Sequence, residues 1–206
     1  MIFNVLSVTQ LEFSLNNKVL LHDLNFKLKK GEMLWVKGAN GSGKSTLLKL
    51  LAGLHPIGPG QVYYNQFDYH NAFRHFKAQI GLSSPPYPLL EHLSVKDYFN
   101  YILVVNKLNR KPFTRILNQL NLIQWENCTI SSLSTGLKQR ISLAQSLMHQ
   151  PSLLLLDEPN ANLDKQNNIA LMSLLKSLNP RMGIIVASHQ TEDWQHMASH
   201  CLELKC

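Results

Sequence analysis

Residues 33–54 read MLWVKGANGSGKSTLLKLLAGL, and this stretch decides the fold. Its first five residues form an apolar run typical of a buried strand, and the leucines that follow Lys44 recur at the spacing of one helix face. Between them, Gly38 to Ser45 match the pattern G-x-x-x-x-G-K-[ST]. A strand, a glycine-rich loop and a helix in this order predict a loop that surrounds the phosphates of a nucleotide.

The residue types of this loop fit that chemistry. Glycines let backbone N–H groups turn toward phosphate oxygens, and the following helix presents its positive end to the same anion. We expect Lys44 to reach the β- and γ-phosphates and the Ser45 hydroxyl to bind Mg²⁺. The predicted nucleotide-binding residues of the loop are Gly38, Ala39, Asn40, Gly41, Ser42, Gly43, Lys44, Ser45 and Thr46.

A second apolar strand, residues 153–156, ends in the acidic pair Asp157 and Glu158. Open α/β sheets bind ligands at the carboxyl ends of their strands. We expect Asp157 to hold Mg²⁺, directly or through water, and Glu158 to orient or deprotonate the water that attacks the γ-phosphate. An apolar strand that ends in two acids is also compatible with an ordinary exit into a loop, so this prediction depends on the phosphate loop belonging to the same sheet.

The rest of the chain alternates strands with helices, which predicts an α/β fold with a parallel sheet. Residues 24–28 alternate polar and apolar side chains, as a half-buried antiparallel strand does, and residues 184–187 form another buried strand. From about residue 79 to 127 the pattern favours loops and helices, and Ser94 with Asp97 resembles a capping box at the start of a helix. The 206 residues fit one domain.

Composition excludes several classes of protein. No apolar run approaches the roughly 20 residues of a membrane-spanning helix, and no secretory signal is visible, so the cytosol or the cytosolic face of a membrane is expected. The three cysteines lack the spacing of a structural zinc site. The net charge of +7 permits a polyanionic partner, but the Lys and Arg residues are dispersed, which favours a solvated surface.

With these motifs in this order, the chain resembles the nucleotide-binding subunits of ABC transporters over nearly all of its length. The loop at Gly38 corresponds to their Walker A motif and residues 153–158 to their Walker B motif. Residues 133–137 (LSTGL) occupy the signature position, residues 162–164 (NLD) the D-loop position and His189 the position of the switch histidine. The order and spacing of these motifs are far more specific than any one of them.

The resemblance implies the architecture. We would then expect a P-loop NTPase (ABC ATPase) core with a mixed sheet, an N-terminal antiparallel β part and a small α-helical insert. Residues 1–206 would then form a single nucleotide-binding domain, with a helical subdomain at approximately 83–150.

The resemblance also implies site roles, with ATP and Mg²⁺ as cofactors. Glu158, His189 and Lys44 would be the catalytic residues, and His189 would hydrogen-bond the γ-phosphate and fix Glu158 with its water. Ser134 and Gly136 would serve the ATP of a second ATPase subunit, so that two identical chains sandwich two nucleotides. A plain helix cap also accounts for Ser134 and Gly136.

The aromatic residue that stacks on adenine in this family has two candidate counterparts here. Phe13 lies near the expected place, and Leu15 is as close by simple counting. A core position for Phe13 is as well supported as a stacking position.

Three positions depart from the family pattern. Thr135 and Leu137 stand where the signature has a glycine and a glutamine. Pro86 stands where the family has a glutamine, in the Q-loop, that touches Mg²⁺ and reports to the membrane subunit. Proline offers no side-chain ligand to a metal, so we expect either water at that position or slow hydrolysis with altered coupling.

Among subfamilies, the chain most resembles the ATP-binding subunit of the cytochrome c maturation haem exporter, the CcmA group. The compact length, residues 42–54 and the sequence ASHQ at residues 187–190 carry this likeness. It implies membrane permease subunits at the cytoplasmic face of the bacterial inner membrane, with the chain bound peripherally. ATP hydrolysis would drive the movement or release of haem, or of a haem-loaded chaperone.

No CxxCH motif is present, so no direct haem binding is expected. Two alternatives remain. One is an ABC ATPase for another exported substrate, such as a lipoprotein, a metal or a drug. The other is a non-transport ABC ATPase acting on nucleic acid, which the absence of a coiled-coil insert or second cassette disfavours, so no nucleic acid partner is expected. For the permease we expect a docking surface at residues 85–101, with Tyr87, Leu89, Leu90 and Leu93 exposed or, alternatively, packed inside the insert.

Overall fold

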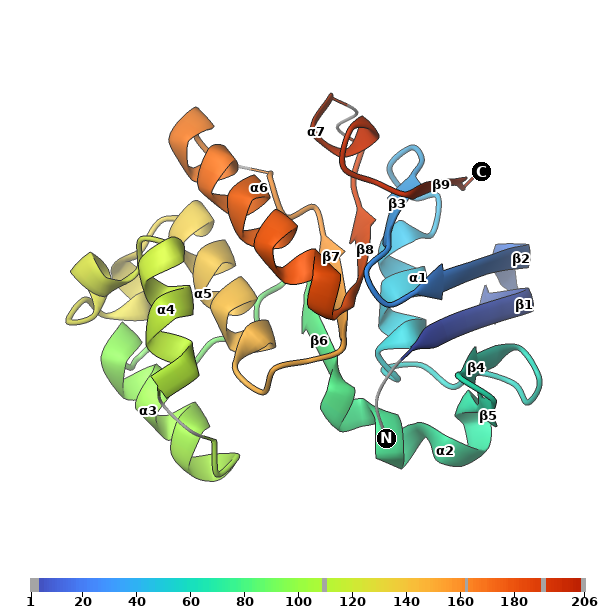
Figure 1. The fold of residues 1–206 in the computed structure, drawn as a ribbon, viewed down its shortest axis with the longest axis horizontal. Coiled ribbons are helices and arrows are strands. Elements are labelled where there is room, and N and C mark those ends of the chain that lie inside the picture. Colours follow the sequence, from blue (N-terminus) through green and yellow to red (C-terminus); the bar gives the residue numbers. More distant parts are fainter. Residues whose placement is uncertain (1–3, 109–110, 162, 190–191, 205–206) are drawn as a thin grey trace.

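The computed structural model describes residues 4–108, 111–161, 163–189 and 192–204 of the 206-residue chain (Figure 1). The described strands form a five-stranded sheet in the order β6-β7-β8-β3-β9 and a four-stranded sheet in the order β2-β1-β4-β5. The helices α3, α4 and α5 gather at the end of the molecule away from the four-stranded sheet. The predicted α/β architecture with an N-terminal antiparallel part is therefore confirmed.

The five-stranded sheet is parallel throughout its recorded pairings. Its strands are β3 (Met33–Lys37), β6 (Ile80–Ser83), β7 (Leu153–Asp157), β8 (Gly183–Ala187) and β9 (His200–Glu203). Every residue of β7 and β8 is buried, which explains their unbroken apolar sequences, since a strand covered on both faces needs no polar alternation. The strand β9 has mostly exposed residues and was not predicted.

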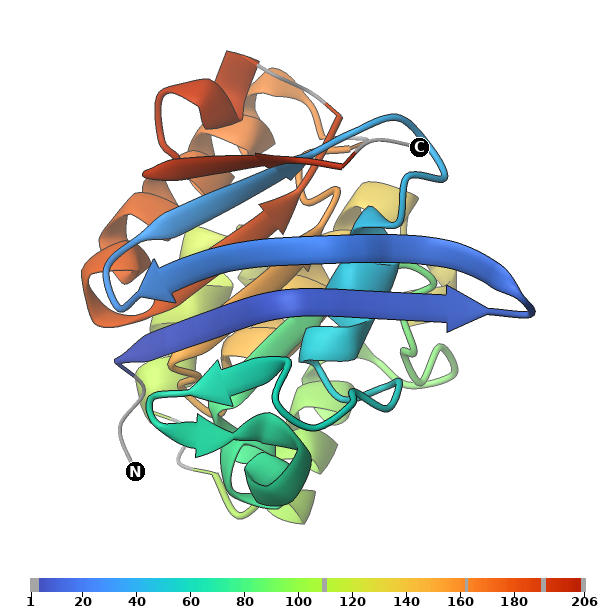
Figure 2. The ribbon, with the colours of Figure 1, turned by 90° about the vertical axis from the view of Figure 1, so that its right-hand side faces the viewer.

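The four-stranded sheet is built on a long hairpin of β1 (Val5–Leu15) and β2 (Lys18–Lys29), with β4 (Val62–Tyr64) and β5 (Phe67–Asp68) added at one side. Leu15 pairs with Lys18, and the two residues between them, Asn16 and Asn17, have φ of 49° and 61°. Asparagine tolerates this left-handed conformation, which two-residue hairpin turns require. The predicted strand at 24–28 is thus the last part of β2. Figure 2 shows the hairpin crossing in front of α1.

Two hydrophobic clusters lie on the two faces of the parallel sheet. One contains Leu153, Leu155 and the buried leucines of α1 (Lys44–Leu51). The other contains Leu154, Leu156 and residues of α5 (Thr135–Leu147) and α6 (Lys165–Leu178). Because strand side chains alternate between faces, the phosphate-loop helix and the α5–α6 pair lie on opposite sides of the sheet.

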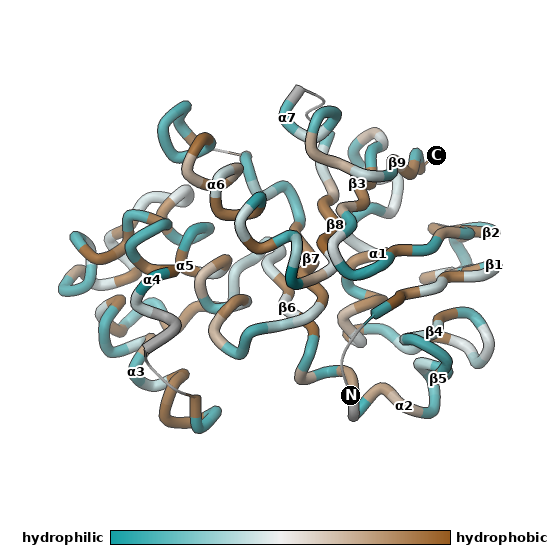
Figure 3. The backbone as a smooth tube through the Cα atoms, in the orientation of Figure 1, coloured by the Kyte–Doolittle hydropathy of each residue, from teal (hydrophilic) through white to brown (hydrophobic). Residues whose placement is uncertain are grey.

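The insert contains α3 (Val95–Val105), α4 (Lys111–Gln119) and the start of α5. Ser94 caps α3, since its hydroxyl accepts the Asp97 N–H at 3.1 Å, which confirms the predicted start of this helix. The helices are amphipathic, and hydrophobic and hydrophilic residues alternate along them in Figure 3.

Shorter elements complete the described chain: α2 (Tyr69–Phe76), α7 (Glu192–Gln195) and the 3₁₀ turns Lys77–Gln79, Ile123–Trp125, Ile130–Ser132 and Asn179–Arg181. Within the described residues, none of the helices has the length and apolarity needed to span a bilayer.

Candidate nucleotide and magnesium site

The phosphate loop joins β3 to α1 in a conformation that only glycine permits at key positions. Gly43 has φ of 93°, and a Cβ there would lie 2.8 Å from Leu21 Cδ2 and 2.9 Å from Leu20 O. A Cβ on Gly38 would lie 2.7 Å from Leu204 O. The hairpin and the residue after β9 thus hold the loop close, and a side chain at Gly38 or Gly43 would force them apart.

Lys44 is 7% exposed, and its ammonium group folds back over the loop. Its Nζ donates to the carbonyl oxygens of Gly38 at 2.7 Å and Ala39 at 3.0 Å. Ser42 Oγ, also buried, has no hydrogen-bond partner among the described residues. A cation and an unpaired hydroxyl at the start of a helix form an environment that suits an anion. Ser45 and Thr46 lie half-buried in the first turn of α1.

Asp157 ends β7 and is 4% exposed. Its Oδ2 accepts a hydrogen bond of 2.7 Å from Ser84 Oγ. Its Oδ1 is buried and has no hydrogen-bond partner among the described residues. A buried carboxylate oxygen without a partner is costly, and Mg²⁺ prefers such oxygen ligands. Asp157 therefore fits the magnesium ligand predicted from the sequence.

Glu158 follows Asp157 at a φ of 47° and is fixed by residues after β8. Its Oε1 accepts from His189 Nδ1 at 2.9 Å and from the His189 backbone N–H at 3.2 Å. Its Oε2 accepts from Ser188 Oγ at 3.0 Å. From α5, Gln139 Nε2 donates to the Glu158 backbone carbonyl at 2.7 Å. The structure thus brings together the predicted base and the predicted switch histidine, and it adds Ser188 and Gln139, which sequence reasoning missed.

The signature residues lie at the start of α5. Ser134 is the N-cap, and its hydroxyl accepts the Leu137 N–H at 3.3 Å, with Gly136 in the first turn. Because α5 and α1 cover opposite faces of the sheet, this packing does not bring Ser134 and Gly136 to the phosphate loop of the same chain. The cap accounts for the local role of Ser134, and a nucleotide role remains a prediction.

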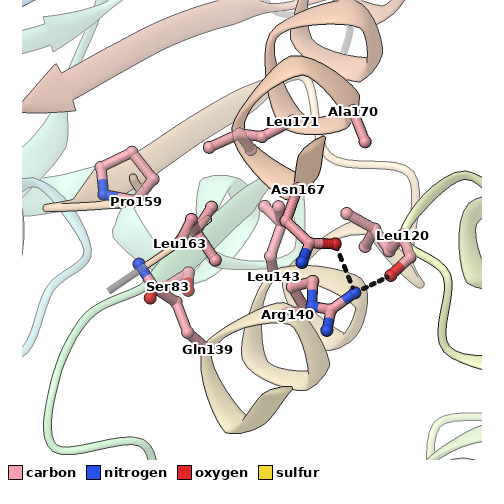
Figure 4. A pocket seen from close by; sticks show the side chains of 10 residues that line it. All are labelled: Ser83, Leu120, Gln139, Arg140, Leu143, Pro159, Leu163, Asn167, Ala170 and Leu171. Carbon is pink, nitrogen blue, oxygen red and sulfur yellow. Dashed lines mark hydrogen bonds between the residues drawn. The ribbon is translucent and has the colours of Figure 1, made fainter. Parts of the chain in front are cut away.

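The start of α6 is tied to α5 (Figure 4). Arg140 Nη1 donates to the carbonyl oxygen of Leu120 at 3.0 Å and to Asn167 Oδ1 at 2.8 Å. Asp164, from the predicted D-loop, caps α6 by accepting the Asn167 N–H at 2.8 Å, and this bond lowers the pKa of Asp164. Asn162, the first residue of the predicted D-loop, lies outside the described residues.

The loop after β6 contains the departure at Pro86, which is exposed. Tyr87 is half-buried beside it, and burial, followed by the negative charge of Asp157, raises the pKa of Tyr87 to about 12. The side chain of this loop that reaches Asp157 by a hydrogen bond is Ser84. Sequence reasoning did not single out Ser84, although its place one residue past β6, beside the end of β7, could have identified it.

The adenine-stacking prediction concerns the end of β1. The Phe13 ring is half-buried and lies against His55, with 5.4 Å between ring centroids and 39° between planes. Leu15 is 47% exposed. Phe13 also packs against the hydrophobic cluster around α1, so its role at adenine stays a prediction.

Comparisons with known proteins agree with this geometry. Residues 21–161 match the family model described as ABC transporter. The ergothioneine transport ATP-binding protein EgtV of Helicobacter pylori (strain G27) is 30% identical over 98% of this chain and 97% of its own length. The cell division ATP-binding protein FtsE of Haemophilus influenzae (strain ATCC 51907 / DSM 11121 / KW20 / Rd) is 31% identical over 90% of this chain and 89% of its own length.

The fold is also that of a solved structure, the dimeric post-hydrolysis state of the ATP-binding cassette MJ0796 bound to ADP and Pi. It has a TM-score of 0.85 and 22% identity, over 97% of this chain and 94% of that one. The family match and the two relatives do not single out the haem-exporter group. The phosphate loop, the two acids and the histidine that contacts the second acid are in place, and the chain belongs to the ABC transporter family as an ATP-hydrolysing subunit.

Proposed function

We propose that the chain binds ATP with Mg²⁺ at the carboxyl end of its parallel sheet and hydrolyses it to drive a membrane transporter. The observation that carries this proposal is the different setting of the two acids. Among the described residues, Asp157 keeps one buried oxygen without a partner, as a metal ligand needs, whereas Glu158 is fixed through both oxygens by His189 and Ser188. Neighbouring carboxylates in different settings can take different chemical roles.

The residues of the chain divide the reaction between them. Lys44 leaves its two carbonyl acceptors and binds the β- and γ-phosphates, and Ser45 and Asp157 hold Mg²⁺. The ion neutralises charge on the phosphate oxygens when bound. Glu158 takes a proton from the attacking water as the water oxygen bonds to the γ-phosphorus and the bond to the ADP oxygen breaks. His189 orients Glu158 and donates to the γ-phosphate.

We further propose that two copies of the chain complete each site. At the start of α5, Ser134 is exposed and Gly136 is half-buried, and the helix covers the face of the sheet opposite to α1. A helix start of this kind favours an anion. A second copy would supply the start of its own α5 to the ATP bound by the first. Each copy would be one domain that spans residues 1–206, with a helical subdomain near 83–150.

For the membrane partner, the exposed apolar side chains favour a docking surface somewhat different from the predicted one. Leu89 and Leu93 pack against the cluster around α3 and α5, whereas Leu90 is 36% exposed. Helix α3 exposes Val104 at 77% and Val105 at 57%. Exposed apolar side chains suit contact with another protein. We propose that Leu90 and the end of α3 contact a permease at the cytoplasmic face of the bacterial inner membrane.

The transported species is proposed from the resemblance to the CcmA group, which implies haem export for c-type cytochrome assembly. The sequence from Ala187 to His189, where the switch histidine contacts Glu158, is part of that resemblance. EgtV and FtsE are named for ergothioneine transport and cell division, so another substrate is the alternative.

The experiment is purification of the tagged chain from its native membrane, with identification of the membrane subunits that co-purify. Cytochrome c maturation subunits support haem export, and any other permease contradicts it. Loss of all membrane subunits in Val104→Glu, with ATP turnover of the isolated chain unchanged, supports the docking surface. Retention of those subunits in that variant contradicts it.

A further inference from the structure

The loop after β6 provides a buried hydroxyl to the end of β7. Ser84 Oγ donates to Asp157 Oδ2 at 2.7 Å, and its other recorded acceptor, Pro85 O, is at 3.4 Å. A hydroxyl has one proton, so the shorter bond to the charged oxygen is the stronger of the two. Ser84 is 9% exposed and Asp157 4%. Water therefore has little access to this bond, and the hydroxyl governs how the carboxylate is oriented.

The register of the sheet explains why Ser84, and not Ser83, makes this contact. Ser83 pairs with Leu156 across β6 and β7. Leu156 belongs to the cluster on the α5 side, and Ser83 Oγ donates to Ser142 Oγ on α5 at 3.0 Å. Since successive side chains alternate between faces, the next residues, Ser84 and Asp157, turn to the face covered by α1. That is the face from which the phosphate loop leads into its helix.

We propose that Ser84 is a positioning residue for magnesium. By holding Asp157 Oδ2, its hydroxyl leaves Oδ1, which has no hydrogen-bond partner in the described part of the chain, free for the cation. The loop thereby contributes a polar side chain to the metal centre without the glutamine that Pro86 replaces. This inference rests on the proposed nucleotide site.

The test compares Ser84→Thr with Ser84→Val in the full chain. The two side chains have nearly the same shape, and only threonine keeps the hydroxyl. ATP affinity is measured by calorimetry with Mg²⁺ and with EDTA, and thermal unfolding confirms that both variants are folded. A partner that orients a metal ligand typically contributes 10–100-fold in metal affinity. Mg²⁺ increases the ATP affinity of the wild type by some factor, and in Ser84→Val this factor should be about tenfold smaller.

In EDTA, both variants should bind ATP as the wild type does. Ser84→Val should also need about tenfold more Mg²⁺ for half-maximal ATP turnover, whereas Ser84→Thr should stay within about twofold of the wild type. Ser83→Ala is the matched control, since it removes a neighbouring buried hydroxyl whose bond runs to α5. It should leave the magnesium dependence unchanged.

Equal magnesium dependence in Ser84→Val and Ser84→Thr would overturn the role of Ser84, as would an equal loss in Ser83→Ala. A wild-type chain that binds ATP equally with Mg²⁺ and with EDTA would instead overturn the nucleotide site on which the inference rests.

Discussion

His189 Nδ1 lies 2.9 Å from Glu158 Oε1, so the histidine after β8 contacts the acid after β7. The His189 backbone N–H reaches the same oxygen at 3.2 Å, and Ser188 Oγ reaches the other at 3.0 Å. The strands that carry these residues are neighbours in the sheet, with Asp157 paired to Ala187. The sheet therefore sets the position of Glu158, the proposed catalytic base, directly.

Glu158→Gln should retain ATP binding and reduce turnover at least about 100-fold, because general-base assistance contributes roughly 10²–10⁴-fold. The amide keeps the shape of the side chain but cannot take a proton. With ATP and Mg²⁺ the variant should form a stable two-chain state, measured by light scattering after gel filtration. A variant that remains monomeric with ATP bound would count against the two-copy arrangement.

His189→Ala should lower turnover by about 10²–10³-fold, the effect that removal of one transition-state hydrogen-bond donor typically has. ATP affinity should change little, because the phosphate loop carries the binding. The control is His92→Ala, since His92 is exposed at the start of the insert. The measurement is the steady-state ATP turnover of the two variants. Equal turnover in both would show that His189 has no role in hydrolysis.

Ser134→Ala separates the two interpretations of the signature residue. Ser134 and Ser94 are both N-caps, of α5 and α3, and loss of a cap of this kind costs about 1 kcal/mol of stability. Ser134→Ala should show that cost together with a loss of ATP turnover, whereas Ser94→Ala should show the cost alone. Unfolding midpoints and turnover are measured side by side. Full turnover in Ser134→Ala would leave only the cap.

Gly43→Ala should destabilise the fold more than Gly41→Ala. Both glycines have positive φ, 93° and 85°, which costs another residue about 1–2 kcal/mol. At Gly43 the added Cβ would also meet Leu21 Cδ2 at 2.8 Å and Leu20 O at 2.9 Å, whereas at Gly41 no atom of the described residues lies within 4 Å. Chemical denaturation measures the difference. Equal losses would mean that the hairpin does not hold the loop.

Local patterns were sufficient to predict the core of this fold. The apolar runs of β3, β7 and β8 have the composition of strands buried on both faces, and the cap at Ser94 defines its helix. The strand β9 was missed because its residues are largely exposed, so they form no apolar run. Its place in the sheet comes from its pairing with β3, which the sequence does not reveal. The strand β1 was not predicted either, and register shifts interrupt its pairing with β2 between Val8 and Ser14.

The candidate site divides in the same way. The phosphate loop, Asp157 and Glu158 are contiguous in sequence with strands, so their motifs predict them. Ser84, Ser188 and Gln139 carry no motif, and their contacts depend on which strands are neighbours and which face each side chain takes. For Leu89 and Leu93 the sequence left two alternatives, exposure to solvent or packing inside the insert. In the structure both side chains pack against the hydrophobic cluster around α3 and α5.

The most direct test of the account is calorimetry of ATP binding to the purified chain, with Mg²⁺ and with EDTA, for the wild type and Lys44→Ala. The ammonium group of Lys44 lies over the phosphate loop. The control is Lys49→Ala, in the last turn of the same helix. The account predicts magnesium-dependent binding in the wild type and Lys49→Ala and its loss in Lys44→Ala. Binding by Lys44→Ala that equals the wild type in affinity and magnesium dependence would contradict it.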